Sequence, residues 1–273
     1  MNAGEFPRAA AARIRESRSL AGVEGYLWAF KRRAQLHHCI GYGTLQVEID
    51  RLAALRKRYS HEIRPVTLLP ALIKAMALAV ERNPQANAIL FKKLFGYRIV
   101  SFDRADVNVP VTRLLNGAPF IFLVTVRDAA RKRIAEIQDE IAAVQREPAE
   151  SLPQLQRINR FARVPLWVAR LFHAVMMRSP AFYVRNAGTC GLTTLDRAAA
   201  DYFFPIGPTS AVFSIGAARP TPVVRDGQIV VRRMLNVCVA IDNYVVPGPA
   251  GAKLVRDFKD LVETGRFMEE ELR

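Results

Sequence analysis

Few side chains in this sequence have the chemistry to transfer protons, attack a carbonyl or bind a metal. Its four histidines, none with a metal-ligand partner at helical spacing, are His37, His38, His61 and His173. Its three cysteines, too few and too scattered for a disulfide framework or a zinc site, are Cys39, Cys190 and Cys238. A nucleophilic thiol needs a neighbouring base, and none is visible beside Cys190 or Cys238. We therefore expect these two thiols to be small buried hydrophobic groups.

Common cofactor and catalytic motifs are missing from the chain. It contains no G-x-G-x-x-G loop, no G-x-x-x-x-G-K-[ST] phosphate loop and no G-x-S-x-G nucleophile elbow. The cysteine usage indicates a reducing setting. The charged stretch 1–20 lacks the apolar core of a signal peptide, so we expect a cytoplasmic protein.

The charge balance is strongly basic. The 273 residues include 40 Lys and Arg against 25 Asp and Glu, so the formal net charge is +15. With 51% apolar and 24% charged residues the composition is globular, which excludes collagen, a coiled coil or a disordered tail. Basic proteins often meet nucleic acid, anionic membranes or phosphorylated ligands, and charge alone does not choose among these.

Apolar periodicity predicts helices and strands mixed along the chain. Helices are expected at 8–19, 26–38, 52–59, 127–146 and 251–267, and strands at 41–50, 97–102, 105–113, 120–126, 210–217, 227–233 and 235–243. The apolar run 66–80 is too short to cross a bilayer and predicts a buried helix. The mixture favours one α/β or α+β layer domain at 26–273, preceded by a basic helix or arm at 1–25.

Ordered sequence blocks resemble the acyltransferase catalytic domain of the 2-oxoacid dehydrogenase complexes, the dihydrolipoamide acyltransferases, whose fold chloramphenicol acetyltransferase shares. The blocks that carry the resemblance are LQVEIDRLAALRKRY, VTLLPALIKAMALAVERNPQANA, ADVNVPVTR with the helix after it, GTCGLTTL, PTSAVFSIGA and DGQIVVRRMLNVCVAID. They cover residues 25–268 in order. The resemblance implies a chloramphenicol-acetyltransferase-like α/β fold, a mixed β-sheet sandwich with covering helices. Because no lipoyl domain is recognisable, we expect the acyltransferase core alone.

The family's catalytic loop reads Asp-His-Arg-x-x-Asp/Asn-Gly, whereas residues 242–248 here read Asp-Asn-Tyr-Val-Val-Pro-Gly. In the family the histidine is the general base that deprotonates a thiol or hydroxyl acceptor. The resemblance places Asn243 at that position, between the retained Asp242 and Gly248. An amide accepts no proton near neutral pH, but it donates hydrogen bonds to a carbonyl.

Two further site positions follow from the resemblance. Thr193 or Thr194 stands where the family has the hydroxyl that donates to the developing oxyanion. Pro247 replaces the acidic residue of the loop and leaves Arg32, which matches the arginine of the family's first helix, without its expected partner.

The loop leaves two functions open. In the first, the chain is a pseudoenzyme that binds coenzyme A, acyl-CoA or another acyl thioester as a binding or scaffold subunit. In the second, a rearranged site still moves an acyl group from a CoA or carrier thioester to a thiol, hydroxyl or amine. His37 or His38 is then the alternative base, although a surface pair at a helix end is the plainer interpretation. His173 is expected to be a satisfied core or interface residue.

Partners follow from the same resemblance. We expect a trimer or a multiple of trimers, with residues 240–250 of one chain facing the 32–45 region of its neighbour. Nucleic-acid binding rests on charge alone and is not expected. No bound metal or covalent cofactor is expected either.

The segment 151–187 is unusually basic and apolar. From 151 to 195 it contains no Asp or Glu and six arginines, Arg157, Arg160, Arg163, Arg170, Arg178 and Arg185. The first three share one side of a predicted helix, which Pro165 divides from the apolar run at 166–177. Three interpretations remain open: a helical pair packed on the sheet with solvated arginines, an interface to a partner or another subunit, and a membrane-surface contact through Arg beside Trp167 and Phe172.

Overall fold

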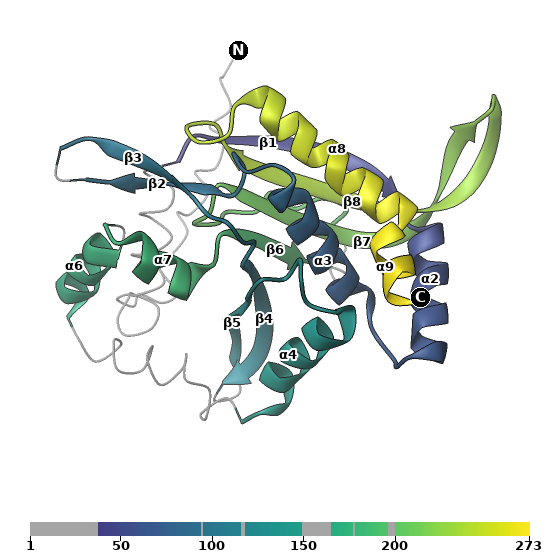
Figure 1. Cartoon of the computed structure of the whole chain (residues 1–273), viewed down its shortest axis with the longest axis horizontal. Helices are drawn as coiled ribbons and strands as arrows, with labels where there is room; N and C mark the ends of the chain where they lie inside the picture. Colours follow the sequence, from purple (N-terminus) through teal and green to yellow (C-terminus); the bar gives the residue numbers. More distant parts are fainter. Residues whose placement is uncertain (1–37, 94, 116–117, 149–164, 177, 196–199) are drawn as a thin grey trace, which may run out of the picture.

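A mixed six-stranded β-sheet lies at the centre of the molecule (Figure 1). The computed structural model describes residues 38–273 except 94, 116–117, 149–164, 177 and 196–199. The strand order is β1-β8-β7-β6-β4-β5, with β6 parallel to both neighbours and the other pairs antiparallel. These strands are β1 (Ile40–Glu48), β4 (Val107–Leu115), β5 (Ala118–Val126), β6 (Cys190–Thr194), β7 (Ala211–Arg225) and β8 (Gln228–Asp242). A separate hairpin pairs β2 (Ala88–Lys92) with β3 (Tyr97–Ser101).

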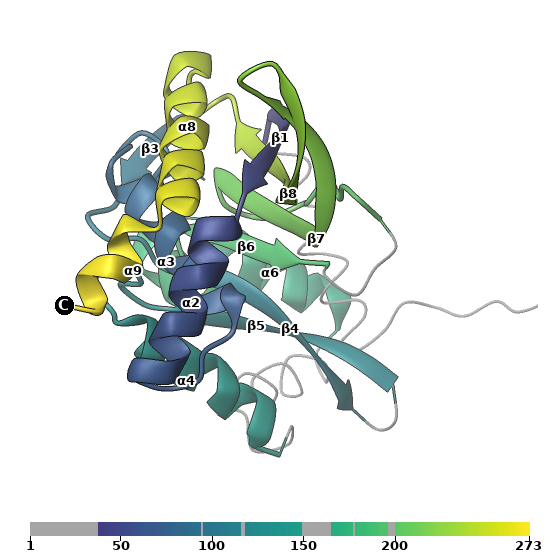
Figure 2. The same ribbon diagram turned by 90° about the vertical axis from the view of Figure 1, so that its right-hand side faces the viewer.

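Helices cover one face of the large sheet, as Figure 2 shows for α2, α3 and α8. The described helices are α2 (Asp50–Glu62), α3 (Leu68–Glu81), α4 (Ile134–Arg146), α6 (Leu166–Met176), α7 (Pro180–Ala187), α8 (Gly248–Thr264) and α9 (Arg266–Glu271). This mixed α/β architecture confirms the predicted fold class. None of the helices in the described ranges combines the length and the apolar character that crossing a membrane needs.

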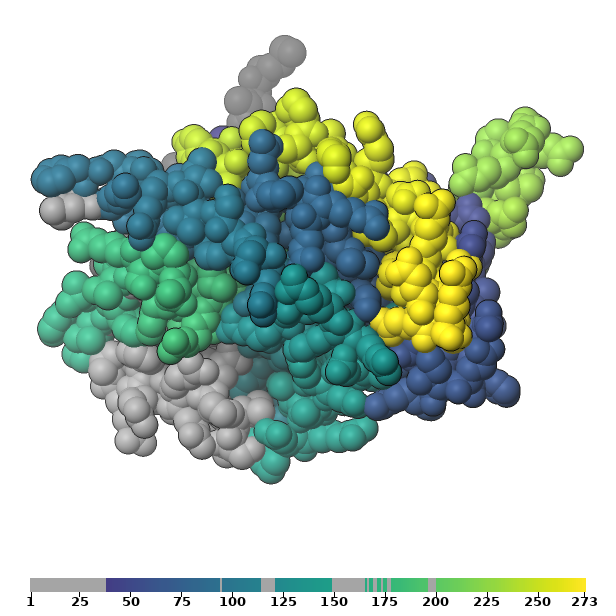
Figure 3. All heavy atoms as spheres, in the orientation of Figure 1, coloured from purple at the N-terminus to yellow at the C-terminus, as the bar shows by residue number. Residues whose placement is uncertain are grey.

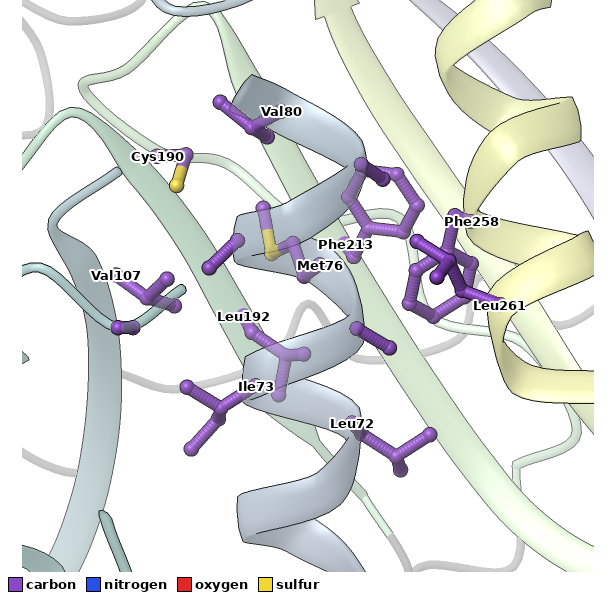
Figure 4. Packing of buried hydrophobic residues seen from close by; sticks show 14 of the residues in the cluster. Leu72, Ile73, Met76, Val80, Val107, Cys190, Leu192, Phe213, Phe258 and Leu261 are labelled. Carbon is purple, nitrogen blue, oxygen red and sulfur yellow. The ribbon is translucent and has the colours of Figure 1, made fainter. Parts of the chain in front are cut away.

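The main core lies between the sheet and α3, where apolar residues surround the helix (Figure 4). Ile73 and Met76 of α3 are fully buried, and so is Leu192 of β6. Phe213 of β7 meets Phe258 of α8 with ring centroids 4.6 Å apart. Each such burial stabilises the fold by about 1.5–3 kcal/mol. The prediction that 66–80 is a buried helix is confirmed.

Two predicted helices have different limits in the structure. Helix α4 begins at Ile134 rather than at 127, because the Asp106 carboxylate holds residues 127–128 in a turn through the Arg127 guanidinium and the Asp128 N–H. The predicted helix 251–267 begins at 248 and is divided into α8 and α9 at Gly265, whose φ of +62° ends an α-helix.

The strands β7 and β8 are longer than predicted. The expected strands 227–233 and 235–243 form one continuous β8, and β7 runs past 217 to Arg225. Pro220 and Pro222, which are opposite Arg233 and Val231 of β8, fit there because β6 pairs with β7 only as far as Ile215, so the other edge of β7 has no β6 partner that needs their missing N–H groups. A two-residue turn with positive φ at both positions, Asp226 and Gly227, joins the strands. The distal hairpin stands clear of the body (Figure 3).

Other predictions fall outside the described residues. These are the arm at 1–25, the helix 8–19, nearly all of 26–38, and the helix carrying Arg157, Arg160 and Arg163. Only His38 of the second predicted helix is described, and it is not helical.

A carboxylate whose side chain is 11% exposed joins the C-terminal helix α9 to the other helices. Glu271 accepts hydrogen bonds from the Lys74 ammonium of α3, the Tyr59 hydroxyl of α2 (3.2 Å) and the Ile134 N–H of α4 (3.0 Å). Lys74 is 8% exposed, and its ammonium also donates to the Lys132 carbonyl at 2.7 Å. The ion pair therefore satisfies a charge that the apolar helix buries.

We expect Glu271→Gln to lower the free energy of unfolding by about 3 kcal/mol, because it leaves the Lys74 ammonium buried without its counter-ion. The measurement is urea denaturation. The double variant Lys74→Met with Glu271→Gln removes both charges and should lose clearly less stability. Equal losses in the two proteins would contradict this account of the pair.

Candidate functional site

The loop 242–248 connects the end of β8 to the start of α8. Asp242 is the last residue of β8, and its carbonyl accepts the N–H groups of Val245 and Val246 at 3.0 and 2.9 Å. Pro247 is exposed at the N-cap of α8 and Gly248 is the first helical residue. The loop is therefore one tight turn that holds Asn243 and Tyr244 at the surface.

The buried carboxylate of Asp242 fastens this turn to the start of β1. It accepts hydrogen bonds from the His38 Nδ1 at 2.5 Å and from the N–H groups of Cys39 and Tyr244, each at 3.1 Å. Burial acts to raise the pKa of Asp242. The donors outweigh it, the His38 imidazole and the Cys39 N–H foremost, and they hold that pKa below its ordinary value.

The imidazole of His38 has an orienting carboxylate on one nitrogen and a free second nitrogen. An ionised carboxylate only accepts, so Nδ1 carries the shared proton. The side chain is 2% exposed, and among the described residues Nε2 has no hydrogen-bond partner. A histidine with Nδ1 fixed by a carboxylate and an unpaired Nε2 has the orientation of a general base, but this Nε2 is buried, so an acceptor reaches it only if the loop moves.

Asn243, which the sequence resemblance predicts at the family's base position, lies over β1. Its N–H donates to the Cys39 carbonyl at 2.8 Å. Its amide lies so close to Gly41 that a Cβ added to this glycine would be 2.6 Å from the Asn243 Nδ2. The absence of a side chain at 41 therefore makes room for the residue at 243.

The sheet register separates the two candidate threonines. Thr194 is in register with Ile215, which is in the helix-covered core. Thr193 is in register with Ser214, which is itself opposite Cys238, so it lies on the other face of the sheet. Thr193 is therefore the better candidate for a hydroxyl that meets a ligand.

Within one chain, Thr193 is distant from Asn243. Thr193 is paired with Ser214 of β7, which is paired with Cys238 of β8, and residue 243 is five residues beyond Cys238 along the chain. At about 3.3 Å per residue this is roughly 16 Å along the strands, with two strand spacings of about 4.8 Å across them. A single chain does not bring these two groups together.

Residues 38–41 of the same chain flank this loop, because β1 pairs with β8 from Ile40 opposite Asp242 onwards. That residues 240–250 also face the 32–45 region of a neighbouring chain stays a prediction.

The other predicted site residues are placed as follows. Arg32 and His37 lie outside the described residues, as does the side chain of His173. His61 is exposed in the last turn of α2. In the described part of the chain, no group of three His, Cys, Asp or Glu side chains is arranged to hold a metal ion.

The two strand cysteines are buried, as predicted. Burial raises the pKa of the Cys190 thiol to about 12 and also raises that of Cys238. Neither thiol is therefore a ready nucleophile at neutral pH.

Comparison with known proteins agrees with this fold. The sequence model of the 2-oxoacid dehydrogenases acyltransferase (catalytic domain) family matches residues 34–155 and 177–269. The chain belongs to that family.

Among curated relatives are dihydrolipoyllysine-residue acetyltransferase components of pyruvate dehydrogenase complexes. The chain is 22% identical to the one from Rickettsia prowazekii, over 83% of this chain and 49% of the relative. It is 24% identical to the one from Bacillus subtilis, over 95% and 51%. The chain thus spans about half the length of these relatives.

Solved structures share the fold. The chain superposes on a dihydrolipoamide acetyltransferase from Azotobacter vinelandii with a TM-score of 0.69 at 17% identity, covering 96% of this chain and 99% of the other. The cubic core of a pyruvate dehydrogenase multienzyme complex gives 0.68 at 18% identity, covering 98% of both. A chloramphenicol acetyltransferase gives 0.50 at 14% identity, covering 89% and 99%.

The depressed pKa of Asp242 predicts an acid-dependent contribution to stability. A carboxyl whose pKa is lower in the folded than in the unfolded state stabilises the protein above its unfolded pKa, and this stability is lost as pH falls through the folded value. We therefore expect Asp242→Asn to lose less stability than the wild type between about pH 5 and pH 2. Urea denaturation at several pH values measures it.

Asp103→Asn is the matched control, because its side chain is 90% exposed and faces Arg104 at 3.7 Å. It should keep the wild-type pH dependence. Parallel curves for Asp242→Asn and the wild type would rule out the proposed linkage.

Proposed function

We propose that this chain is an acyl-thioester-binding member of its family that is impaired in histidine-based transfer. The observation that supports the proposal is the exposed Asn243, the residue that we assign to the base position, whose N–H donates to the Cys39 carbonyl and whose amide occupies the space at Gly41. A thioester carbonyl that reaches this loop meets an amide donor and no proton acceptor at that position. Coenzyme A or acyl-CoA is the proposed ligand, and its phosphates suit a chain of net charge +15.

The missing proton acceptor defines the impairment. A thiol acceptor must lose its proton as it attacks the thioester carbon, and an amide cannot take it. Removing a general base typically lowers the rate by about 10²–10⁴-fold. Binding needs only donors, so it survives the loss of the base.

The proposal includes a second copy of the chain. A hydroxyl at Thr193 and the loop at Asn243 serve one thioester only if they come from different chains, because the sheet register holds them apart within one. The related cubic core of a pyruvate dehydrogenase complex is an assembly of many copies. We propose a trimer-based assembly with the ligand site between chains.

Acetyl-CoA should raise the melting temperature of the wild type, because a ligand that binds only the folded state stabilises it. We expect slow acetyl transfer to dihydrolipoamide, and a gain of at least about tenfold in Asn243→His as a base returns. The measurements are thermal shift with acetyl-CoA and the rate of thioester loss.

Asn243→Gln is the control, because it keeps an amide and should bind without any gain in rate. No thermal shift at millimolar acetyl-CoA would remove the binding proposal. Binding without a gain in Asn243→His would remove the account of the missing base.

A second candidate function is favoured by one specific observation, the His38–Asp242 pair, whose buried Nε2 is unpaired among the described residues. In this alternative the chain is an active acyltransferase with a rearranged site. The Nε2 of His38 takes the proton of the acceptor thiol, the sulfur forms a bond to the acyl carbon, and the coenzyme A thiolate leaves. The Asp242 carboxylate stabilises the imidazolium that forms.

Two variants of His38 distinguish a general base from a residue that only positions the loop. His38→Asn keeps a donor near the Nδ1 position for Asp242 but removes Nε2, whereas His38→Ala removes both. If His38 is the base, both variants should lose transfer by about 10²-fold or more while still binding acetyl-CoA. If His38 only positions the loop, His38→Asn should retain most of the activity. The pH profile of the rate is the second readout.

A further inference from the structure

A small second core lies at one end of the molecule, apart from the main core (Figure 1). The hairpin β2–β3 packs one face on α7, where Phe91 meets Tyr183 edge to face at 5.5 Å. Helix α6 joins the same core through Phe172, which meets Phe182 at 5.4 Å. We call this unit, β2 and β3 with α6 and α7, the end lobe.

The outer face of α6 is apolar and uncovered. Trp167, Leu171 and Val175 are 67%, 58% and 56% exposed. A spacing of four residues places them in one stripe along an α-helix. Phe172, which packs against the small core, lies about 100° around the helix from Leu171, so the exposed stripe is on a different side of α6 from this contact. Single exposed apolar side chains are ordinary, whereas a continuous stripe marks a contact surface.

The end lobe is basic and contains no acid. No Asp or Glu occurs in 83–102 or in 151–195. Its described exposed cations are Lys92, Lys93, Arg98, Arg178 and Arg185. The Arg98 guanidinium donates to the Arg178 carbonyl at 3.3 Å, which links the hairpin to the end of α6.

An aromatic side chain marks the tip of the hairpin. Phe95 is 88% exposed, in the turn where the Lys93 N–H donates to the Gly96 carbonyl. The hairpin and α6 lie at the same end of the molecule, at the left of Figure 3. Bulky apolar groups and cations are thus presented together.

These features discriminate among possible occupants. A second copy that docked end lobe to end lobe would bring two acid-free cationic surfaces together, which like-charge repulsion opposes. A nucleic acid would match the charge and has Trp167 and Phe95 for stacking, but it would leave the aliphatic Leu171 and Val175 without an apolar partner. An anionic bilayer matches both features, because phosphates meet the cations and the acyl boundary takes the stripe.

We propose that the end lobe docks on an anionic phospholipid bilayer. Helix α6 lies in the plane of the membrane with Trp167, Leu171 and Val175 inserted at the level where headgroups meet acyl chains. The cations of the lobe face the lipid phosphates. This attachment is peripheral, since the eleven residues of α6 are too short to span a bilayer. The proposal does not depend on the ligand of the 242–248 loop.

The test is flotation of the full chain with vesicles of phosphatidylcholine alone or of phosphatidylcholine and phosphatidylglycerol at about 3:1. We expect binding to the anionic vesicles, at least about tenfold weaker binding to the neutral ones, and loss of binding at high salt. The double variant Trp167→Gln with Leu171→Gln should lose most of the binding. Lys93→Gln with Arg178→Gln should weaken it by a factor on the order of ten.

Matched controls lie outside the end lobe. Ile229→Gln removes an apolar side chain that is 77% exposed on the β7–β8 hairpin, and Lys57→Gln removes an exposed cation of α2. Both should bind vesicles like the wild type. All variants are first compared by thermal melting, so that a folding defect is recognised.

Four outcomes would overturn the proposal. Equal binding to neutral and anionic vesicles would remove the charge argument, and stripe variants that bind like Ile229→Gln would remove the apolar one. A change in molar mass by light scattering in the stripe variants, without lipid, would assign α6 to contacts between copies. If the protein bound a nucleic acid but not vesicles, and the stripe variants bound it as well as the wild type, the partner of the lobe would be the nucleic acid.

Discussion

The site of this protein depends on one buried carboxylate, that of Asp242. A carboxylate out of contact with water must be surrounded by donors. The donors here come from two places, the turn itself and the residues just before β1. This requirement fixes where the exposed Asn243 lies and gives His38 its orientation. The need of the Asp242 carboxylate for hydrogen-bond donors thus positions both residues that are candidates for the chemistry of the loop, Asn243 and His38.

The main core determines which groups of the same chain can lie close to the 242–248 loop. The sheet and its covering helices hold Thr193 and Asn243 apart within a chain, so a shared ligand requires two chains. The same constraint makes assembly part of the proposed chemistry, whether the protein only holds a thioester or also transfers its acyl group. The identity of the base, His38 or no residue, separates these alternatives.

Charge and apolar surface are divided unevenly over the molecule. Along the helices over the main sheet, basic residues are paired with acids, as in Arg64–Asp139 and Lys253–Asp257. The end lobe has no acid to pair with, and it carries the uncovered stripe of α6. Part of the excess positive charge noticed in the sequence is therefore located in the end lobe, and this part has a proposed partner that differs from the ligand of the loop.

The sequence by itself determined the family, the fold class and most elements of the main core. Period-two patterns in β1 and the apolar run of α3 are local signals, and the ordered blocks needed no coordinates. The Asp-Gly pair at 226–227 was a further local signal, which would have predicted the β7–β8 turn. The start of α4 was mispredicted because a distant carboxylate, Asp106, holds the preceding turn.

Only the tertiary structure decided the contacts that define the site. His38 and Asp242 are 204 residues apart along the chain, and no periodicity relates them. The choice between Thr193 and Thr194 is a matter of strand register, since a shift of one residue exchanges the faces of a sheet. Local patterns report which side of an element is apolar, whereas the partners of a polar group are set by how the elements pack.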